Sequence, residues 1–284
     1  MTISSEIHAM ALRLCATLDL PAIAGLHLPA ASATDDAGRD EFGFVFLEDG
    51  SAAPFYVSLP GTLAALWERF PRPAEACPSL HDCLAGFTAT ALAERALAIG
   101  AWNAVSQYLM RRAGFRCPPR ARGGADEPRR GERVGMVGYF CPVVDRLVAA
   151  GVEVLVVERQ PQRVPERAGV LLSTDPASLS TCRVVYCTAS TLINDSLEEI
   201  LGCRGEGASM QLIGPSGSGL PDAVFAHGVD AVGGVSFADV DALRRALERG
   251  ESWGPVGQKY ELTAASYPGI DALIDAASSN PAGS

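Results

Sequence analysis

The feature that most constrains the fold is a strand–turn–helix–strand pattern in the middle of the chain. An apolar run over 134–137 stops at Gly138, and Pro142 then precedes apolar residues at helical spacing over 143–149. Proline is favoured in the first turn of a helix, where its missing N–H has no intrahelical partner in any case. A second apolar run follows over 152–157. A strand, a helix and a strand within this length predict a βαβ unit of a parallel sheet.

The turn of this unit can be compared with the G-x-G-x-x-G fingerprint of dinucleotide-binding proteins. With Gly138 as the middle glycine, Met136 and Cys141 take the outer positions, so only one glycine of three matches. Glu158 follows Gly138 by about 20 residues, where a ribose-binding acid would lie. Because the acid fits and the glycines do not, a bound dinucleotide is the weaker interpretation. Glu158 alone also suits an ordinary strand that ends in a charged residue.

Composition and charge indicate a globular protein and argue against nucleic acid as a partner. The chain has 284 residues, of which 48% are hydrophobic and 20% charged, and its net charge is −10. Binding to phosphate backbones needs clustered Lys and Arg. One basic cluster exists among prolines and glycines, which is typical of a solvated linker, with an RNA-binding arm as the less favoured alternative. It comprises Arg111, Arg112, Arg116, Arg120, Arg122, Arg129 and Arg130.

The beginning of the sequence gives no sign of export. Glu6 lies there without a basic segment before the apolar residues, and no uninterrupted apolar run reaches the length of a bilayer span. We therefore expect a cytoplasmic protein with no membrane partner. The oligomeric state is left open, with a homodimer as one alternative.

The eight cysteines form no C-x-x-C pairs, and most are expected to be buried hydrophobes or free thiols. The densest group places Cys77, His81 and Cys83 within one short stretch that could hold a metal. The same stretch suits a helix start, with Ser79 as N-cap and Asp82 in the first turn. A zinc site usually needs a further ligand pair, and none has matching spacing, so the helix start is favoured.

The chain is predicted to contain two units joined by a linker. Residues 1–117 place strands before helices, which suggests an α+β domain, and 118–131 form the Pro-, Gly- and Arg-rich linker. Residues 132–262 alternate strands and helices, which predicts an α/β domain with a mostly parallel sheet covered on both faces. Residues 263–284 are expected to be a tail whose last residues are loose.

Individual elements follow from the periodicity of apolar residues. In the first unit we expect a helix over 4–20, strands over 23–28, 42–47 and 54–59, a helix over 63–70, and a helical region over 79–112 broken near Gly100. In the second unit we expect strands over 134–137, 152–157, 184–187, 210–213 and 231–235, and helices over 143–149, 192–201, 221–226 and 238–249.

Polar groups gather where three of these parallel strands end. Hydroxyl and amide side chains follow the strand 184–187, and a hydroxyl-rich loop follows the strand 210–213. Hydroxyls and backbone N–H groups at one sheet edge suit an anion, a carboxylate or a polar small molecule. At least one of Ser190 and Thr191 is expected merely to cap its helix. The predicted ligand-binding residues are Gly138, Tyr139, Phe140, Glu158, Thr188, Ser190, Thr191, Asn194, Gly214, Pro215 and Ser216.

Four segments together resemble the putative heavy-metal chelation family, whose function is unknown: Val134–Phe140, Thr188–Asn194, Gly214–Ser216 and Phe225–Gly234. The resemblance implies a Rossmann-like domain preceded by a smaller domain similar to the N-terminal domain of enolases. The segment Gly100–Ala104 resembles the closing helix of that smaller domain, and Asn103 on it joins the expected ligand-binding residues. The family resemblance implies a small-molecule site between the domains and supplies no reaction.

The first turn differs from the family pattern, which often has histidine where this chain has Tyr139. A phenol is a far poorer ligand for a soft metal than an imidazole, which weakens a metal role at this turn. Cys141 is a weak candidate for a thiolate ligand, and the metal ligands are otherwise unknown. A second difference is the flexible segment 217–220, where the family often has Thr-Pro-Leu.

The expected function is binding of a small polar or anionic metabolite in the cleft between the domains. No cofactor is identified, although a transition metal bound together with its ligand is compatible with the resemblance. The alternative is an enzyme acting there on a nucleotide-like or amino-acid-derived molecule. No Ser-His-Asp, paired-carboxylate or H-E-x-x-H pattern supports a mechanism, so turnover and catalytic residues are left undecided.

Overall fold

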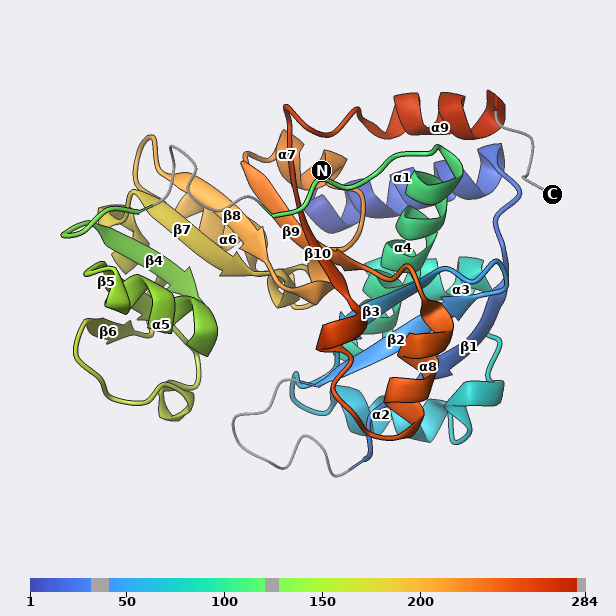
Figure 1. The fold of residues 1–284 in the computed structure, drawn as a ribbon, viewed down its shortest axis with the longest axis horizontal. Coiled ribbons are helices and arrows are strands. Elements are labelled where there is room, and N and C mark those ends of the chain that lie inside the picture. Colours follow the sequence, from blue (N-terminus) through green and yellow to red (C-terminus); the bar gives the residue numbers. More distant parts are fainter. Residues whose placement is uncertain (32–40, 121–127, 280–284) are drawn as a thin grey trace.

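The computed structural model describes residues 1–31, 41–120 and 128–279 and has two sheets within them (Figure 1). One is antiparallel with the strand order β1-β2-β3, and the other has the order β10-β9-β8-β7-β4-β5-β6. Six strands of the larger sheet run parallel and β10 is antiparallel to β9. The fold is the predicted α/β class, with a smaller antiparallel unit before a mostly parallel sheet.

The smaller sheet is covered on both faces. Its strands are β1 (Ile23–His27), β2 (Phe42–Leu47) and β3 (Ala52–Tyr56). One face packs on α4 (Leu92–Arg112), around which lie α1 (Ile3–Thr17), α2 (Thr62–Arg69) and α3 (Leu80–Ala85). On the other face Phe44 and Phe46 form a buried cluster with Leu243 of α8 (Val240–Glu248). A helix from late in the chain therefore completes the packing of the first sheet.

Helix α4 runs unbroken through Gly100, so the predicted break at this residue is wrong. The helical region is interrupted earlier, between α3 and α4, within 86–91. A Cβ on Gly100 would lie 2.5 Å from the ring of Phe55 and 3.0 Å from Val45. Glycine costs about 1 kcal/mol of helix propensity relative to alanine. Here it allows the helix to approach the sheet closely, and that packing offsets the cost.

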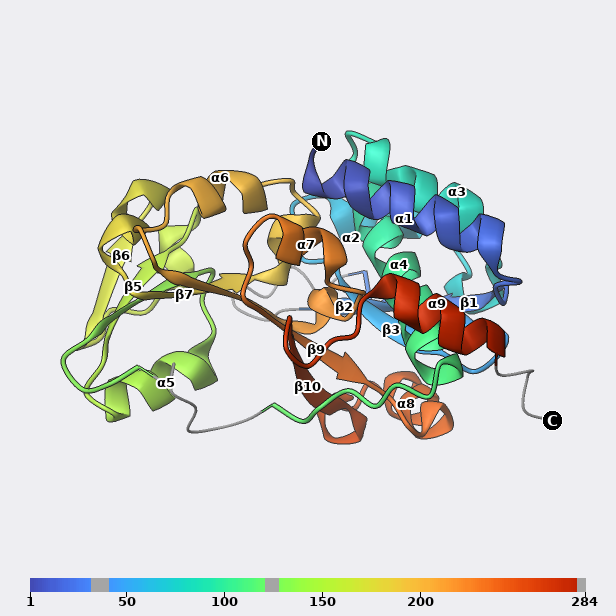
Figure 2. The same cartoon turned by 90° about the horizontal axis from the view of Figure 1, so that it is seen from above.

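The larger sheet has helices on both faces, with α5 on one side and α6 on the other (Figure 2). Its strands are β4 (Arg133–Val137), β5 (Glu153–Val157), β6 (Val170–Ser173), β7 (Val184–Thr188), β8 (Ser209–Ile213), β9 (Ala231–Ser236) and β10 (Gln258–Thr263). The helices beside it are α5 (Cys141–Ala149), α6 (Leu197–Gly202) and α7 (Asp222–Ala226). The five predicted strands of this unit are confirmed.

Two strands of this sheet, β6 and β10, were not predicted from the sequence. Both lie at edges of the sheet, where one side of the strand has no partner strand. Leu171 and Leu172 of β6 are partly exposed, and β10 carries Lys259 and Glu261 beside the buried Tyr260. The apolar run of β6 is short, and that of β10 is interrupted by charged residues, unlike the run of a strand buried on both faces.

The strand order reverses between β4 and β7. The chain adds β5 and β6 on one side of β4, then returns to place β7, β8 and β9 on the other side. Connections on the two sides of such a point leave in opposite directions, which opens a crevice at the carboxyl ends of the strands. This topology fixes where a ligand can reach the sheet.

The segment predicted as a tail contains a helix, α9 (Ile270–Ser279), which packs beside α4. Leu273 and Ala277 of α9 are buried, and Arg112 of α4 donates to the carbonyl of Ala277. Residues 280–284, which include the end expected to be loose, lie outside the described residues. Within the described ranges, no helix is both long and apolar enough to cross a membrane.

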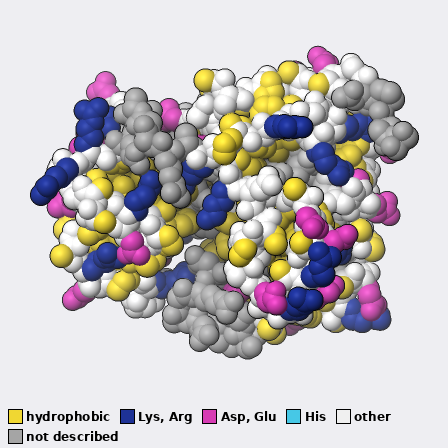
Figure 3. Space-filling model, in the orientation of Figure 1, with side chains coloured by type: hydrophobic (Ala, Val, Ile, Leu, Met, Phe, Trp, Pro, Cys, Tyr) yellow, Lys and Arg dark blue, Asp and Glu magenta, His cyan; other side chains and the backbone are white. Residues whose placement is uncertain are grey.

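Charged groups are interspersed on the face drawn in Figure 3, where basic and acidic side chains lie among each other. Several arginines of the predicted basic cluster bind within the chain. Arg111 pairs with Asp49, and Arg120 pairs with Glu261 at 3.3 Å. Arg122 lies outside the described residues.

Candidate small-molecule site

A cavity of about 520 Å³ lies at the carboxyl ends of the parallel strands. The loops after β4, β5, β7 and β8 form most of its wall, and other parts come from β2, β3, the loops after β3 and β6, and the helices α4 and α6. Every predicted ligand-binding residue except Asn103 lines it: Gly138, Tyr139, Phe140, Glu158, Thr188, Ser190, Thr191, Asn194, Gly214, Pro215 and Ser216. The structure therefore brings together residues that lie far apart in the sequence.

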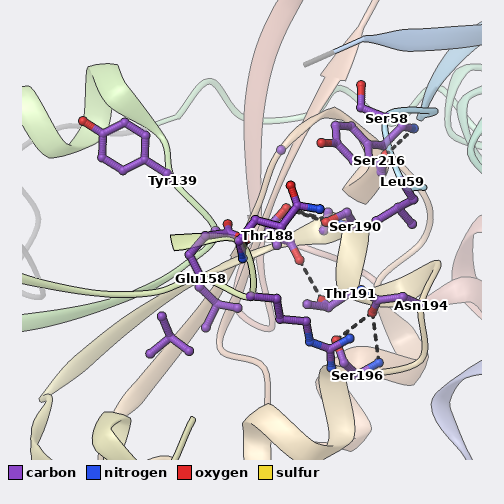
Figure 4. A pocket seen from close by; sticks show the side chains of 18 of the residues that line it. Ser58, Leu59, Tyr139, Glu158, Thr188, Ser190, Thr191, Asn194, Ser196 and Ser216 are labelled. Carbon is purple, nitrogen blue, oxygen red and sulfur yellow. Dashed lines mark hydrogen bonds between the residues drawn. The ribbon is translucent and has the colours of Figure 1, made fainter. Parts of the chain in front are cut away.

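The turn after β4 depends on Gly138, whose φ of +81° favours glycine. A Cβ there would also lie 3.2 Å from the side chain of Thr188. The next residue, Tyr139, points away from the cluster of hydroxyls in Figure 4. The ring of Phe140 lies beside both Gly138 and Gly214, 3.8 Å from the position of a Cβ on either. This ring therefore connects the turns that follow β4 and β8.

The hydroxyls after β7 have distinct hydrogen-bond roles (Figure 4). Thr188 Oγ1 accepts from the backbone N–H of Ser190 and lies 3.0 Å from Ser190 Oγ. Thr188 is therefore the N-cap of this turn, and the prediction that Ser190 or Thr191 caps a helix is wrong. Thr191 Oγ1 donates to the carbonyl of Thr188 at 2.6 Å. Asn194 Oδ1 accepts from both the backbone N–H and the hydroxyl of Ser196. These two bonds hold the side-chain oxygen of Asn194 and so fix the direction of its amide nitrogen.

The loop after β8 places Ser216 at the junction of the two sheets. Ser216 is 2% exposed, and its Oγ accepts from the backbone N–H of Tyr56 on β3 at 2.9 Å. Asn103 of α4 lies behind this loop, and its Nδ2 donates to the carbonyls of Pro54 and Ser216. Asn103 is thus outside the cavity wall, and its contacts position Ser216.

The segment that carries Asn194 is anchored by Arg95, a buried residue of α4. Its Nε donates to the carbonyl of Ile193 at 2.6 Å, and its terminal nitrogens contact the carbonyl of Phe87 and pair with Asp195 at 2.6 Å. Asp195 has a φ of +59°, which breaks the helix predicted over 192–201. The structure has a 3-10 turn at Ala189–Leu192, and α6 begins only at Leu197.

Sequence reasoning missed part of the cavity wall. Phe42, Tyr56, Ser58, Leu59, Pro60 and Leu92 come from the first unit. Their position depends on how distant parts of the chain pack together, and local sequence patterns do not predict such packing. Arg159, Gln160 and Arg163 follow Glu158 in one loop, and two cations beside a predicted site residue were a usable signal. Arg159 pairs with Glu199 at 3.8 Å across the cavity wall.

Sulfur and imidazole groups lie elsewhere in the described structure. Cys141 is exposed, and its Sγ lies 3.5 Å from Asp145, which pairs with Arg167. Complete burial raises the pKa of the Cys187 thiol to about 12. Among the described residues, no group of three or more His, Cys, Asp or Glu side chains is arranged to hold a metal.

The stretch considered as a metal site forms a helix start instead. Ser79 Oγ accepts from the backbone N–H of Asp82 at the beginning of α3, as the capping interpretation predicts. His81 is exposed, whereas Cys83 is buried and its pKa is raised to about 11 by desolvation. The thiol of Cys77 donates to the backbone carbonyl of Ala24.

The fold and the cavity define a two-unit α/β protein with a small-molecule-sized site at the reversal point of a parallel sheet. Residues 126–266 match the model of the family described as putative heavy-metal chelation, DUF364. The chain belongs to this family.

Similar proteins include two solved structures and one protein compared by sequence. A crystal structure of a DUF364 protein with unknown function from Pyrococcus horikoshii has a TM-score of 0.67 and 19% identity, covering 93% of this chain and 100% of that chain. A second, from Desulfitobacterium hafniense, has a TM-score of 0.64 and 15% identity, covering 91% and 98%. An uncharacterized protein of Methanocaldococcus jannaschii is 28% identical over 156 residues, which cover 53% of this chain and 57% of that protein.

The family description implies a heavy metal, and the donor set of the cavity does not fit one held by side chains. Its described wall offers hydroxyl, amide and carboxylate oxygens, and neither a thiolate nor an imidazole. Soft metals prefer sulfur and nitrogen ligands. Side chains of this wall suit the polar groups of an organic molecule instead.

Proposed function

We propose that this protein binds a small anionic metabolite in the cavity between its two sheets. The observation that carries the proposal is the buried hydroxyl of Ser216, which lines the cavity and uses its oxygen to accept from Tyr56. Its proton has no acceptor among the described residues. A buried donor without a partner is costly, and an anionic ligand would satisfy it.

Other donors of the wall are half-buried and also have protons that no described acceptor takes. Ser58 Oγ accepts from the backbone N–H of Glu41, and its proton likewise has no acceptor in the described part of the chain. Of Thr188 and Ser190, which share one hydrogen bond, one hydroxyl keeps a free proton. The amide nitrogen of Asn194 has no acceptor in the described ranges either. A set of donors with few competing acceptors favours a carboxylate or a phosphate.

The position of the cavity supports the same proposal. The order β6-β5-β4-β7-β8-β9 corresponds to that of doubly wound nucleotide-binding sheets, which supports the Rossmann-like interpretation. Ligands of such sheets bind where the order reverses. A heavy metal would enter this cavity only within a complex whose coordinating atoms the metabolite supplies.

Binding, rather than a particular reaction, is what the geometry supports. In the described structure, no serine or threonine hydroxyl of the cavity wall is hydrogen-bonded to a histidine or a carboxylate. Such a contact is the usual sign of an activated nucleophile. The enzyme alternative therefore has no supporting observation here.

The proposal can be tested with Asn194→Asp, which keeps the oxygen that holds Ser196 and replaces the amide donor with a negative charge. Inorganic phosphate and citrate serve as probes, with affinity measured by calorimetry. We expect the variant to weaken their binding at least about tenfold, as for loss of a charge-assisted hydrogen bond. Gln258→Glu on the exposed start of β10 adds the same charge elsewhere and should leave binding unchanged. No binding to the wild-type protein, or equal effects of the two substitutions, would contradict the proposal.

A further inference from the structure

The cavity has chemically different ends. Ser58 and Ser216 lie on one side in Figure 4, Thr188 and Ser190 lie in the middle, and Glu158 lies beyond them. The serine side supplies hydrogen-bond donors. An ionised carboxylate supplies only acceptors, so a ligand group that contacts Glu158 itself must donate.

The carboxylate of Glu158 is held in place by its own loop. Its Oε1 accepts from the backbone N–H of Gln160 at 3.0 Å, directly after β5 ends. Within the described residues the second oxygen has no partner. A carboxylate fixed by one oxygen can accept from two adjacent hydroxyl groups, as the acid at the end of the second strand does in doubly wound sheets.

The same loop indicates that this donating group is neutral. Arg159 and Arg163 line the cavity beside Glu158. Arg159 also pairs with Glu199 at 3.8 Å, but cations in this loop still disfavour an ammonium group of the ligand more than a hydroxyl. Hydroxyl groups therefore fit this end better than an amine does.

The turn after β4 is poorly suited to a second nucleotide half. In the first turn of α5, Pro142 has no N–H and Val143 donates to the carbonyl of Phe140, which leaves the N–H of Cys141 for a ligand. A dinucleotide places its pyrophosphate on free N–H groups at this helix start. The ring of Phe140 also lies against Gly138 and Gly214, in the crevice that the pyrophosphate would cross.

From these contacts the structure assigns the ligand to one chemical class, an anion that carries a vicinal diol and has the size of a single nucleotide. The diol binds Glu158 and the anionic group binds the serine side. Nucleoside monophosphates and phosphorylated or acidic sugars share this chemistry. The inference rests on the proposed function, because it needs the anion site as well as Glu158.

The experiment compares probes that differ in one group each, with calorimetry on the wild-type protein. The probes are adenosine monophosphate, its 2′,3′-dideoxy analogue, ribose 5-phosphate, gluconate, inorganic phosphate and NAD. We expect removal of the diol to weaken binding about tenfold, and NAD to bind no better than inorganic phosphate. Ribose 5-phosphate and gluconate separate a sugar ligand from a nucleotide, because neither has a base.

Glu158→Gln provides the matched variant, with Glu166→Gln on the exposed surface as its control. Glu158→Gln should weaken diol-bearing probes about tenfold and leave the dideoxy analogue unchanged. Equal binding of the diol and dideoxy probes, or tightest binding by NAD, would overturn the inference while anion binding persists. Absence of binding by every anion would instead remove the proposed function. A thermal melt of each variant establishes that it is folded.

Discussion

The side-chain nitrogen of Asn103 donates one hydrogen bond to the carbonyl of Ser216 and a second to the carbonyl of Pro54, each 3.0 Å long. Asn103 is 1% exposed, so neither carbonyl can turn to water if the amide is lost. One residue of α4 thereby fixes β3 and the loop after β8 to each other. The geometry of Ser216 in the cavity depends on this residue, which does not touch the cavity.

Replacing this amide should weaken both folding and binding. For Asn103→Ala we expect the free energy of unfolding to fall by about 2–4 kcal/mol, because two buried carbonyls lose their donor. Affinity for inorganic phosphate should also fall. Gln107→Ala is the control, since that amide donates to the carbonyl of Ser218 and the hydroxyl of Tyr260 and not to Ser216. Urea denaturation and calorimetry measure the two effects, and equal losses of affinity in both variants would show that Asn103 has no special role.

Arg95 should contribute more to the free energy of unfolding than Asp195, the acid with which it pairs. For Arg95→Met we expect a loss of roughly 2–4 kcal/mol in the free energy of unfolding, because buried carbonyls of Ile193 and Phe87 lose their donor. Asp195→Asn should cost under about 1 kcal/mol, since the side chain of Asp195 is 51% exposed and asparagine tolerates its positive φ. Chemical denaturation of both variants checks the order. A larger loss for Asp195→Asn would mean that the ion pair, and not carbonyl satisfaction, holds this segment.

A chelator should leave the folded protein intact. The described cavity wall has no thiolate or imidazole, and the stretch around Cys83 is a capped helix start. Domains folded by a structural metal unfold when it is removed. We therefore expect the same melting temperature with and without EDTA, and we would follow metal content by elemental analysis. One tightly held metal per chain together with a large drop in melting temperature would show that a site exists, and Cys77→Ser would then locate or exclude it.

Stability should fall at alkaline pH. Burial raises the pKa of Cys83 and Cys117 to about 11 and that of Cys187 to about 12, from an ordinary value of 9.0. A group whose pKa is raised on folding stabilises the fold below its unfolded pKa, and this contribution is lost as pH rises through the folded pKa. The free energy of unfolding should therefore decline above about pH 9. Each thiol contributes a loss of up to about 1.4 kcal/mol per pH unit until the pH reaches its folded pKa. Denaturation at a series of pH values tests this.

Cys187→Ala isolates one contribution to that decline. Its curve should be flatter between pH 9 and 12 than that of the wild type, whereas Cys77→Ala, which removes an exposed thiol, should not differ. A wild-type stability that stays constant or increases over this range would contradict the assignment of these buried thiols.

Prediction from the sequence was most accurate for strands that are buried on both faces of the sheet. The strands β4, β5, β7 and β8 are mostly apolar because both faces of the sheet are covered, and each was predicted. The edge strand β6 was missed because its apolar run, over 170–172, is shorter than the runs that indicate a buried strand. Gly100 was predicted to break the helical region because glycine weakens an isolated helix. In the structure the same glycine lets α4 pack closely against Phe55.

The site was predictable as far as topology decides it. Parallel strands end at one edge, and this rule alone brought Thr188, Glu158 and Ser216 together. The contribution of Ser58 depends on contact between distant units and has no local pattern. Asn103 was expected to bind the ligand from family resemblance, whereas its contacts show a supporting position behind Ser216. Residue type could not separate these two roles.

The packing of α8 and α9 against the first sheet and α4 has a consequence for how the protein is made. While the ribosome extends the chain, the aromatic face formed by Phe44 and Phe46 stays uncovered until Leu243 is translated, and α4 stays partly uncovered until Leu273 is translated. The first half therefore cannot close its core as it emerges, although domains usually fold in the order of synthesis. Until the last helices are translated, the nascent chain exposes an aggregation-prone aromatic surface. The yield of folded protein in the cell should therefore depend on chaperones that cover this surface.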